Sequence, residues 1–82
     1  MTSRRGARHA HDAVSLAEKA NNSILIARSL HILGVCYDYE GNLDSCLYCF
    51  NRAAGIFRSL DNIEKLSNVL SDEANAYRQS LA

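Results

Sequence analysis

Residues 30–42 of the chain read LHILGVCYDYEGN, and the rest of the sequence can be organised around this stretch. Its apolar residues recur at the spacing of an α-helix, and further apolar residues fall on the other sides of the same helix. Gly41 fits a left-handed C-terminal cap, which glycine adopts without a steric penalty, and Asn42 can cap a following helix. The stretch therefore predicts the second half of a central helix that must be covered on several sides.

The composition fits one small folded domain. The chain has 82 residues, of which 48% are apolar and 22% charged, and it contains no proline. A domain of this size buries a modest core, so it commonly gains stability from a partner, a metal or disulfides. Nine basic and nine acidic residues give a formal charge of zero. Bulk electrostatics therefore provides no argument for binding to nucleic acid or to a membrane surface.

The cysteines and the N-terminus bear on the compartment. Three cysteines are an odd number without the spacing of a disulfide scaffold, which favours a reducing, cytoplasmic environment. Arg4, Arg5 and Arg8 are followed by no apolar segment, so a secretory signal is not expected. The Arg-rich start leaves a mitochondrial presequence as the minor alternative. No apolar run approaches the roughly 20 residues of a membrane span.

Three pairs of helix-breaking residues divide the chain into four helical segments. The pairs are Asn21-Asn22, Gly41-Asn42 and Asp61-Asn62. Asp61 and Glu64 are spaced as a capping pair for the last segment. Connections this short make successive helices antiparallel neighbours. We predict a single all-α domain over residues 1–82, with a half-repeat at 4–20, a full hairpin at 23–60 and a half-repeat or capping helix at 62–81.

The chain matches itself when it is shifted by forty residues. The shift pairs residues of the same type or size across a helix, a break and another helix: Ala13 with Ala53, Leu16 with Ile56, Leu30 with Leu70, Gly34 with Ala74 and Tyr37 with Tyr77. A repeat of this length that contains two helices is typical of a helical solenoid. We therefore expect the antiparallel hairpins to stack as a short α-α superhelix.

The repeat resembles a known family. In order and spacing, the matching residues are Leu30, Leu33, Gly34, Tyr37, Gly41-Asn42, Cys46, Phe50 and Ala53. They resemble the signature of the tetratricopeptide repeat, in the long variant of about 40 residues that G-protein-regulating and light-chain-type adaptor proteins contain. The resemblance implies an antiparallel hairpin in which Gly34 allows a close approach by Cys46, where the family usually has alanine. Glu73 departs from the pattern because it stands where Leu33 predicts leucine. We expect Glu73 to remain in water, since a buried unpaired carboxylate is unfavourable.

The resemblance also implies a binding face, because the family turns the first helix of each pair toward a concave groove. It places nine residues on that face: Arg28, His31, Val35, Asp38, Tyr39, Asn68, Ser71, Asn75 and Arg78. Their amide, guanidinium, hydroxyl and aromatic groups could hold an extended or helical peptide. An ordinary polar helix surface is the equal alternative. His31 and Ser71 stand where the carboxylate-clamp subset of the family uses lysine, so binding of chaperone tails is not expected.

Other chemistry is weakly indicated. Cys46 and Cys49 have the spacing of a metal pair, but they lie within a helix, and buried small side chains are the favoured interpretation. His9 and His11 do not share a helix face. His31 and Cys36 cannot pair within one helix, so no nucleophile has an oriented base. We therefore predict no metal, no cofactor and no enzymatic activity.

The sequence predicts a non-catalytic interaction module or adaptor that binds a protein or peptide. Solenoids usually need three repeats for stability, and this chain has two at most. We therefore expect self-association or a place in a larger assembly. The alternative is a structural subunit or fragment of a larger assembly, or a homo-oligomer, with no separable ligand. A nucleic-acid accessory with a basic arm is the third hypothesis, and the three arginines are a weak signal for it.

Overall fold

The computed structural model describes residues 2–81, with the side chains of residues 6–81. It contains four α-helices: α1 (Thr2–Lys19), α2 (Ser23–Tyr39), α3 (Leu43–Ser59) and α4 (Ile63–Leu81). No strand occurs within this range. The predicted all-α fold of four helices is confirmed, and its segment boundaries differ from the observed helices by one or two residues at most ends.

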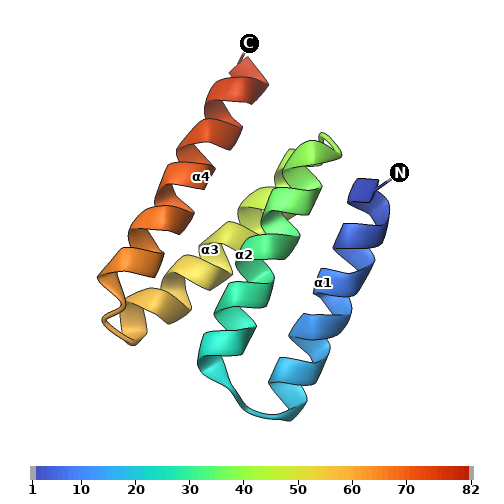
Figure 1. Ribbon diagram of the computed structural model, residues 1–82. Coiled ribbons are helices and arrows are strands. Elements are labelled where there is room, and N and C mark those ends of the chain that lie inside the picture. The colour runs from blue at the N-terminus through green and yellow to red at the C-terminus, as the bar shows by residue number, and fades with distance from the viewer. Residues whose placement is uncertain (1, 82) are drawn as a thin grey trace.

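The helices pack in the order of the chain. α2 lies between α1 and α3, α4 packs on α3, and α4 also touches α2. Figure 1 shows α1 and α4 on opposite flanks, with α2 and α3 between them. Because each connection is short, each helix runs antiparallel to the one before it. α1 and α4 therefore each have one side that no other described helix covers.

The three turns are built alike. Asn21, Gly41 and Asp61 have positive φ angles of 54°, 77° and 55°. The backbone N–H of the following residue then donates to a carbonyl of the last helical turn, at 3.0 Å for Asn22, 2.9 Å for Asn42 and 2.9 Å for Asn62. These bonds satisfy carbonyl groups that a helix end leaves unpaired. Short polar side chains tolerate the left-handed conformation, which explains the use of asparagine and aspartate beside glycine.

The same three asparagines begin the next helices. The side-chain oxygens of Asn22, Asn42 and Asn62 accept from backbone N–H groups three residues on, at 3.1, 3.3 and 3.1 Å. The predicted capping pair of Asp61 and Glu64 is wrong. Asp61 occupies the left-handed position of the preceding helix end, and Asn62 takes the capping role one residue later.

The core is formed around the inner sides of α2 and α3. The fully buried large side chains include Phe50, Phe57 and Leu30. The predicted close contact at Gly34 is confirmed, because a Cβ added there would lie 2.5 Å from Phe50 Cε1 and 3.3 Å from the Cys46 carbonyl oxygen. Only glycine allows the two helices to approach this closely.

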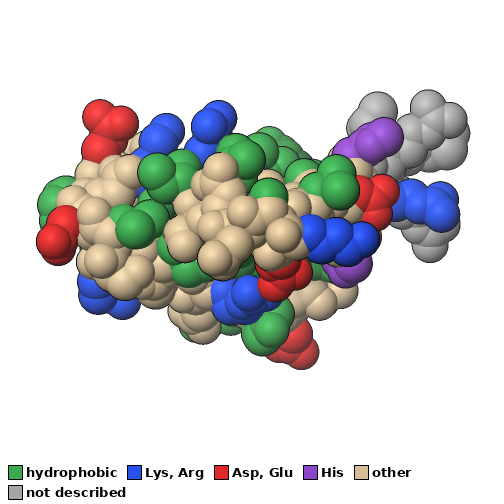
Figure 2. Space-filling view, turned by 90° about the horizontal axis from the view of Figure 1, so that it is seen from below, with side chains coloured by type: hydrophobic (Ala, Val, Ile, Leu, Met, Phe, Trp, Pro, Cys, Tyr) green, Lys and Arg blue, Asp and Glu red, His purple; other side chains and the backbone are tan. Residues whose placement is uncertain are grey.

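α2 is covered on several sides, as predicted, because α1, α3 and α4 all pack on it, but its whole circumference is not enclosed. Ala27 and Leu33 are buried, but Ile32 is 57% exposed and Tyr39 is 80% exposed. Ile24 is also exposed, at 49%. Within the described range, three neighbouring helices are too few to enclose the whole circumference of α2. Figure 2 shows hydrophobic side chains reaching the surface between charged ones on the side of the molecule seen from below.

Candidate functional site

The nine residues predicted for the groove lie on α2 and α4. On α2, His31, Val35 and Asp38 are half-buried, whereas Arg28 and Tyr39 are exposed. On α4, all four are exposed, namely Asn68, Ser71, Asn75 and Arg78. The α2 residues are therefore partly committed to packing, and the α4 residues form a polar, solvent-facing surface.

Two of the α4 candidates bind one another. The Arg78 guanidinium donates to Asn75 Oδ1 at 2.9 Å. The structure thus brings these two residues together, as their spacing of three on a helix allows. A ligand that uses either side chain must replace or extend this bond.

His31 makes a contact that the sequence did not indicate. Its Nε2–H donates to Asp72 Oδ2 at 2.6 Å, and the two side chains are 21% and 42% exposed. The imidazole also lies edge-on to the Phe50 ring, with centroids 5.7 Å apart. The repeat register makes His31 and Ser71 equivalent positions but predicts no contact for either of them, so Asp72 was not identified as a partner. His31 is therefore held between α3 and α4 by the fold.

Asp38 lies at one end of the contact between α2 and α4. With Gly41 and Leu43 it lines a small pocket of about 160 Å³, and α4 contributes Ala76, Gln79 and Ser80 to the other wall. The pocket holds one carboxylate and few other polar groups. It is large enough for ordered water or for the tip of one side chain.

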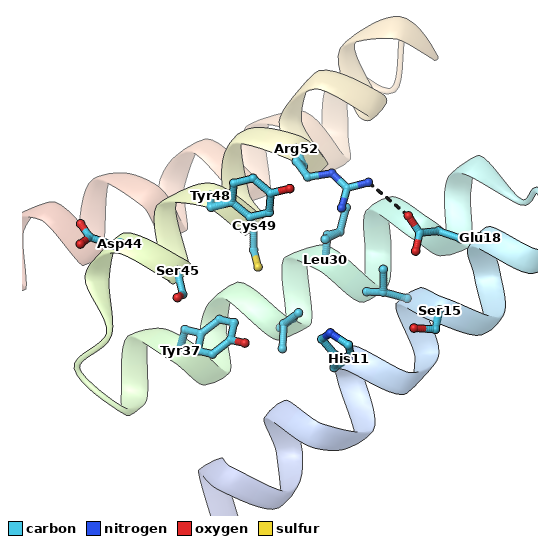
Figure 3. Close-up of a pocket in the computed structure, with 12 residues that line it drawn as sticks. His11, Ser15, Glu18, Leu30, Tyr37, Asp44, Ser45, Tyr48, Cys49 and Arg52 are labelled. Atoms are coloured by element: carbon cyan, nitrogen blue, oxygen red, sulfur yellow. Dashed lines mark hydrogen bonds and ion pairs between the residues drawn. The ribbon is translucent and has the colours of Figure 1, made fainter.

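A larger pocket of about 490 Å³ lies between α1 and α3, with α2 beneath it. Its floor is apolar and consists of Val14, Leu30, Leu33 and Cys49. Polar and aromatic side chains surround the floor: His11, Ser15, Glu18, Tyr37, Asp44, Ser45, Tyr48 and Arg52. Figure 3 shows Arg52 of α3 reaching across the opening to Glu18 of α1, whereas Asp44 lies at the far end of the α3 side. An apolar floor with a polar rim is the usual composition of a binding site.

Two contacts position Arg52 at the rim. Its guanidinium lies 3.5 Å from Glu18 Oε2, which bridges α3 and α1 (Figure 3), and its Cζ lies 5.9 Å from the centre of the Tyr48 ring. The Arg52 and Glu18 side chains are 38% and 50% exposed, so this ion pair contributes little to stability. Its main effect is to orient the guanidinium across the pocket.

None of the nine predicted residues lines the larger pocket. The sequence does carry a signal for this pocket on α3, where a polar and aromatic stripe runs along one side of the helix: Asp44, Ser45, Tyr48 and Arg52. Residues at this spacing share one helix face. That α1 faces this stripe across α2 follows only from the packing of the three helices.

The cysteines are packed as apolar side chains. Cys46 and Cys49 are 0% and 3% exposed, which confirms the prediction that they are buried, and Cys36 is half-buried. Burial raises the pKa of Cys46 to about 11, with smaller contributions from Asp38 and other acidic groups. Burial also raises the pKa of Cys36 and Cys49. All three groups are therefore neutral thiols near pH 7, whereas nucleophiles and metal ligands are thiolates.

The remaining titratable candidates are dispersed. His11 lines the larger pocket, while His9 and Arg8 are exposed on α1. The side chains of Arg4 and Arg5 lie outside the described residues. Among the side chains that are described, no group of three or more histidine, cysteine, aspartate or glutamate residues could hold a metal ion.

A scan of family models and searches of curated proteins and of solved structures find no match to this chain. The resemblance to tetratricopeptide repeats therefore rests on the residues and the repeat of this chain alone. Between residues 2 and 81, no helix is both long enough and apolar enough to cross a membrane.

Proposed function

We propose that the chain is a non-catalytic interaction module, built as a short tetratricopeptide-like stack, that binds a protein or peptide in the pocket between α1 and α3. The observation that carries this proposal is the apolar floor of a 490 Å³ pocket beneath a rim of oriented polar groups. Three neutral thiols and a balanced net charge support binding over nucleophilic catalysis or nucleic-acid recognition. The free cysteines favour the cytoplasm as its compartment.

The pocket's charges suggest the chemistry of the ligand. Asp44 has no cationic partner among the described side chains, whereas Glu18 and Arg52 pair with each other. A peptide with an apolar side chain beside a lysine or arginine fits this arrangement. The apolar side chain covers the floor near Leu33 and Cys49, and the cation approaches Asp44.

The experiment selects peptides from a displayed random library on the purified chain and measures their Kd by fluorescence anisotropy. We expect Asp44→Lys to weaken binding of the selected peptides by about tenfold or more, because it reverses the charge that attracts the cation. The matched control is the double variant Asn75→Ala, Arg78→Ala, which changes only the α4 surface. Circular dichroism checks that each variant keeps its helical content.

The control also tests the groove predicted from the sequence. If the α4 double variant weakens binding and Asp44→Lys does not, the ligand uses the surface formed by α2 and α4. If no selected peptide binds above background, the module has no separable peptide site, and the second candidate gains support.

The second candidate function is that of a structural subunit held in an assembly by its helix faces. The observation that favours it is the exposure of large apolar side chains at both flanks, including Leu16 on α1 and Tyr77 on α4. Such residues become buried when another helix packs on them, and the burial stabilises the assembly.

A further inference from the structure

The outer face of α4 has the pattern that α2 uses to bind α3. The forty-residue shift places Leu70, Ala74 and Tyr77 of α4 at the positions of Leu30, Gly34 and Tyr37 of α2. Leu30 is 2% exposed in the packed fold, whereas Leu70 is 41% and Tyr77 is 49% exposed. α4 therefore presents an unpartnered copy of a helix-binding face.

The outer face of α1 has the complementary pattern. The same shift places α1 at the position of α3, and the stripe of Cys46, Cys49, Ala53 and Ile56 on α3 becomes Gly6, His9, Ala13 and Leu16 on α1. Leu16 is 66% exposed, and His9, two helical turns away, is exposed as well. Ala13 is half-buried, and Gly6 lies at the edge of this face against α2, where an added Cβ would be 3.2 Å from Cys36 Sγ. Because α1 and α4 lie on opposite flanks of the molecule (Figure 1), these two faces cannot meet within one chain.

Two positions that are apolar in the α2–α3 hairpin carry a carboxylate and an imidazole on these outer faces. Glu73 stands where α2 has Leu33, and His9 stands where α3 has Cys49. Leu33 and Cys49 are both buried and line the same pocket. The Gly34 contact with Cys46 and Phe50 sets the hairpin register, in which Leu33 and Cys49 lie on facing helices. An α4 face packed on an α1 face would therefore replace an apolar pair by a carboxylate and an imidazole, which attract one another.

We infer that a second copy of this chain stacks end to end on the first, with α1 of one copy packed on α4 of the other in the register of the α2–α3 hairpin. The inference does not rest on the proposed peptide site. The register pairs Leu66 with Leu16, Leu70 with Ala13, Glu73 with His9 and Ala74 with Gly6. Because the interface joins two different faces, the assembly is an open chain of copies and not a closed dimer. However many copies it contains, it keeps one free α1 face at one end and one free α4 face at the other.

The test uses sedimentation velocity on the full chain over a series of concentrations. We expect the average mass to rise with concentration and to pass the mass of a dimer without reaching a plateau there. Two variants then block one end each: Ala74→Arg on α4 and Leu16→Arg on α1. Both side chains are exposed in the single chain, so the helices should form normally.

Each blocked variant alone should be monomeric. We expect association to weaken more than about a hundredfold, because stacking would bury a guanidinium that has no partner. An equimolar mixture of the two variants should regain a one-to-one dimer. In that mixture the intact α1 face of the Ala74→Arg variant meets the intact α4 face of the Leu16→Arg variant. Asn68→Arg, on the opposite side of α4, is the control and should polymerise like the parent.

The inference is overturned by any of three results. The parent chain could stay monomeric at its highest soluble concentration. Leu16→Arg alone could still form a dimer, which would indicate a symmetric contact between two α4 faces. The mixture of the two blocked variants could fail to associate while circular dichroism shows that both are folded.

Discussion

His31 on α2 and Asp72 on α4 are joined by a 2.6 Å hydrogen bond between residues 41 positions apart in the chain. Among the described side chains, no other hydrogen bond or ion pair links these two helices. α4 otherwise depends on α3 for its position. The bond therefore ties the last helix to the centre of the fold while the Phe50 ring supports the imidazole from α3.

This bond should couple the two residues energetically. We expect a double-mutant cycle of His31→Ala and Asp72→Ala to give a coupling free energy of about 0.5–1 kcal/mol, because the pair is only partly buried. The free energy of unfolding in urea provides the measurement. A matching cycle on Asn75 and Arg78, which interact within α4, should give about 0.2–0.5 kcal/mol. Strict additivity at His31 and Asp72 would mean that α4 is positioned by apolar packing alone.

Replacing Gly34 or Gly55 by alanine should change the free energy of unfolding in opposite directions. At Gly34 the added Cβ would lie 2.5 Å from Phe50 Cε1, and the Phe50 ring is 1% exposed with little freedom to move. We expect Gly34→Ala to lower the free energy of unfolding by about 1–3 kcal/mol, and Gly34→Leu to lower it further. At Gly55 the added Cβ would meet no atom within 4 Å.

Gly55→Ala is therefore the matched control for Gly34→Ala, because both glycines lie within helices. It should raise stability by about 0.5–1 kcal/mol, since alanine loses less conformational entropy in a helix. Thermal unfolding of the three variants separates the two effects. Equal changes at positions 34 and 55 would show that the close approach of α2 and α3 is not needed for stability.

Stability should fall at high pH through Cys46. Burial raises the pKa of the Cys46 thiol from 9.0 to about 11, so the folded state favours the protonated form. This stabilisation is fully present below about pH 9 and is lost as the pH rises to about 11, because the unfolded chain releases the proton first. The loss should reach about 2 kcal/mol.

The comparison for this prediction is Cys46→Ala, which removes the thiol and keeps a small side chain. Urea unfolding between pH 8 and pH 11 should show a steeper loss of stability for the parent than for Cys46→Ala. Parallel curves would indicate that the buried thiol does not titrate with the folding equilibrium and that other groups cause any loss.

Local patterns predicted the helices and the hairpin contact well. The residue pairs at 21–22, 41–42 and 61–62 mark the three turns of the described range, and Gly34 identifies a close approach of α2 and α3. These features depend on neighbours within a few residues, or on one small side chain that a helix pair requires. The capping residue at the start of α4 was misplaced by one position because Asp61 and Asn62 can both cap a helix, and only the left-handed φ of Asp61 distinguishes them.

The candidate site was harder to predict because it depends on how helices are arranged across the chain. A repeat register relates equivalent residues but does not say which residues of different helices meet, so it gave no indication that His31 contacts Asp72. The larger pocket arises because α1 and α3 both pack on α2 while remaining apart from one another.

Sequence patterning thus accounts for four helices, three turns and the α2–α3 contact, because helix formation and capping are local and the close contact needs one glycine. Only the packing of the helices determines that Ile32 stays exposed, that Glu18 reaches Arg52 and that the outer faces of α1 and α4 remain uncovered. Those outcomes depend on the number and direction of neighbouring helices, which the periodicity of a single helix does not specify.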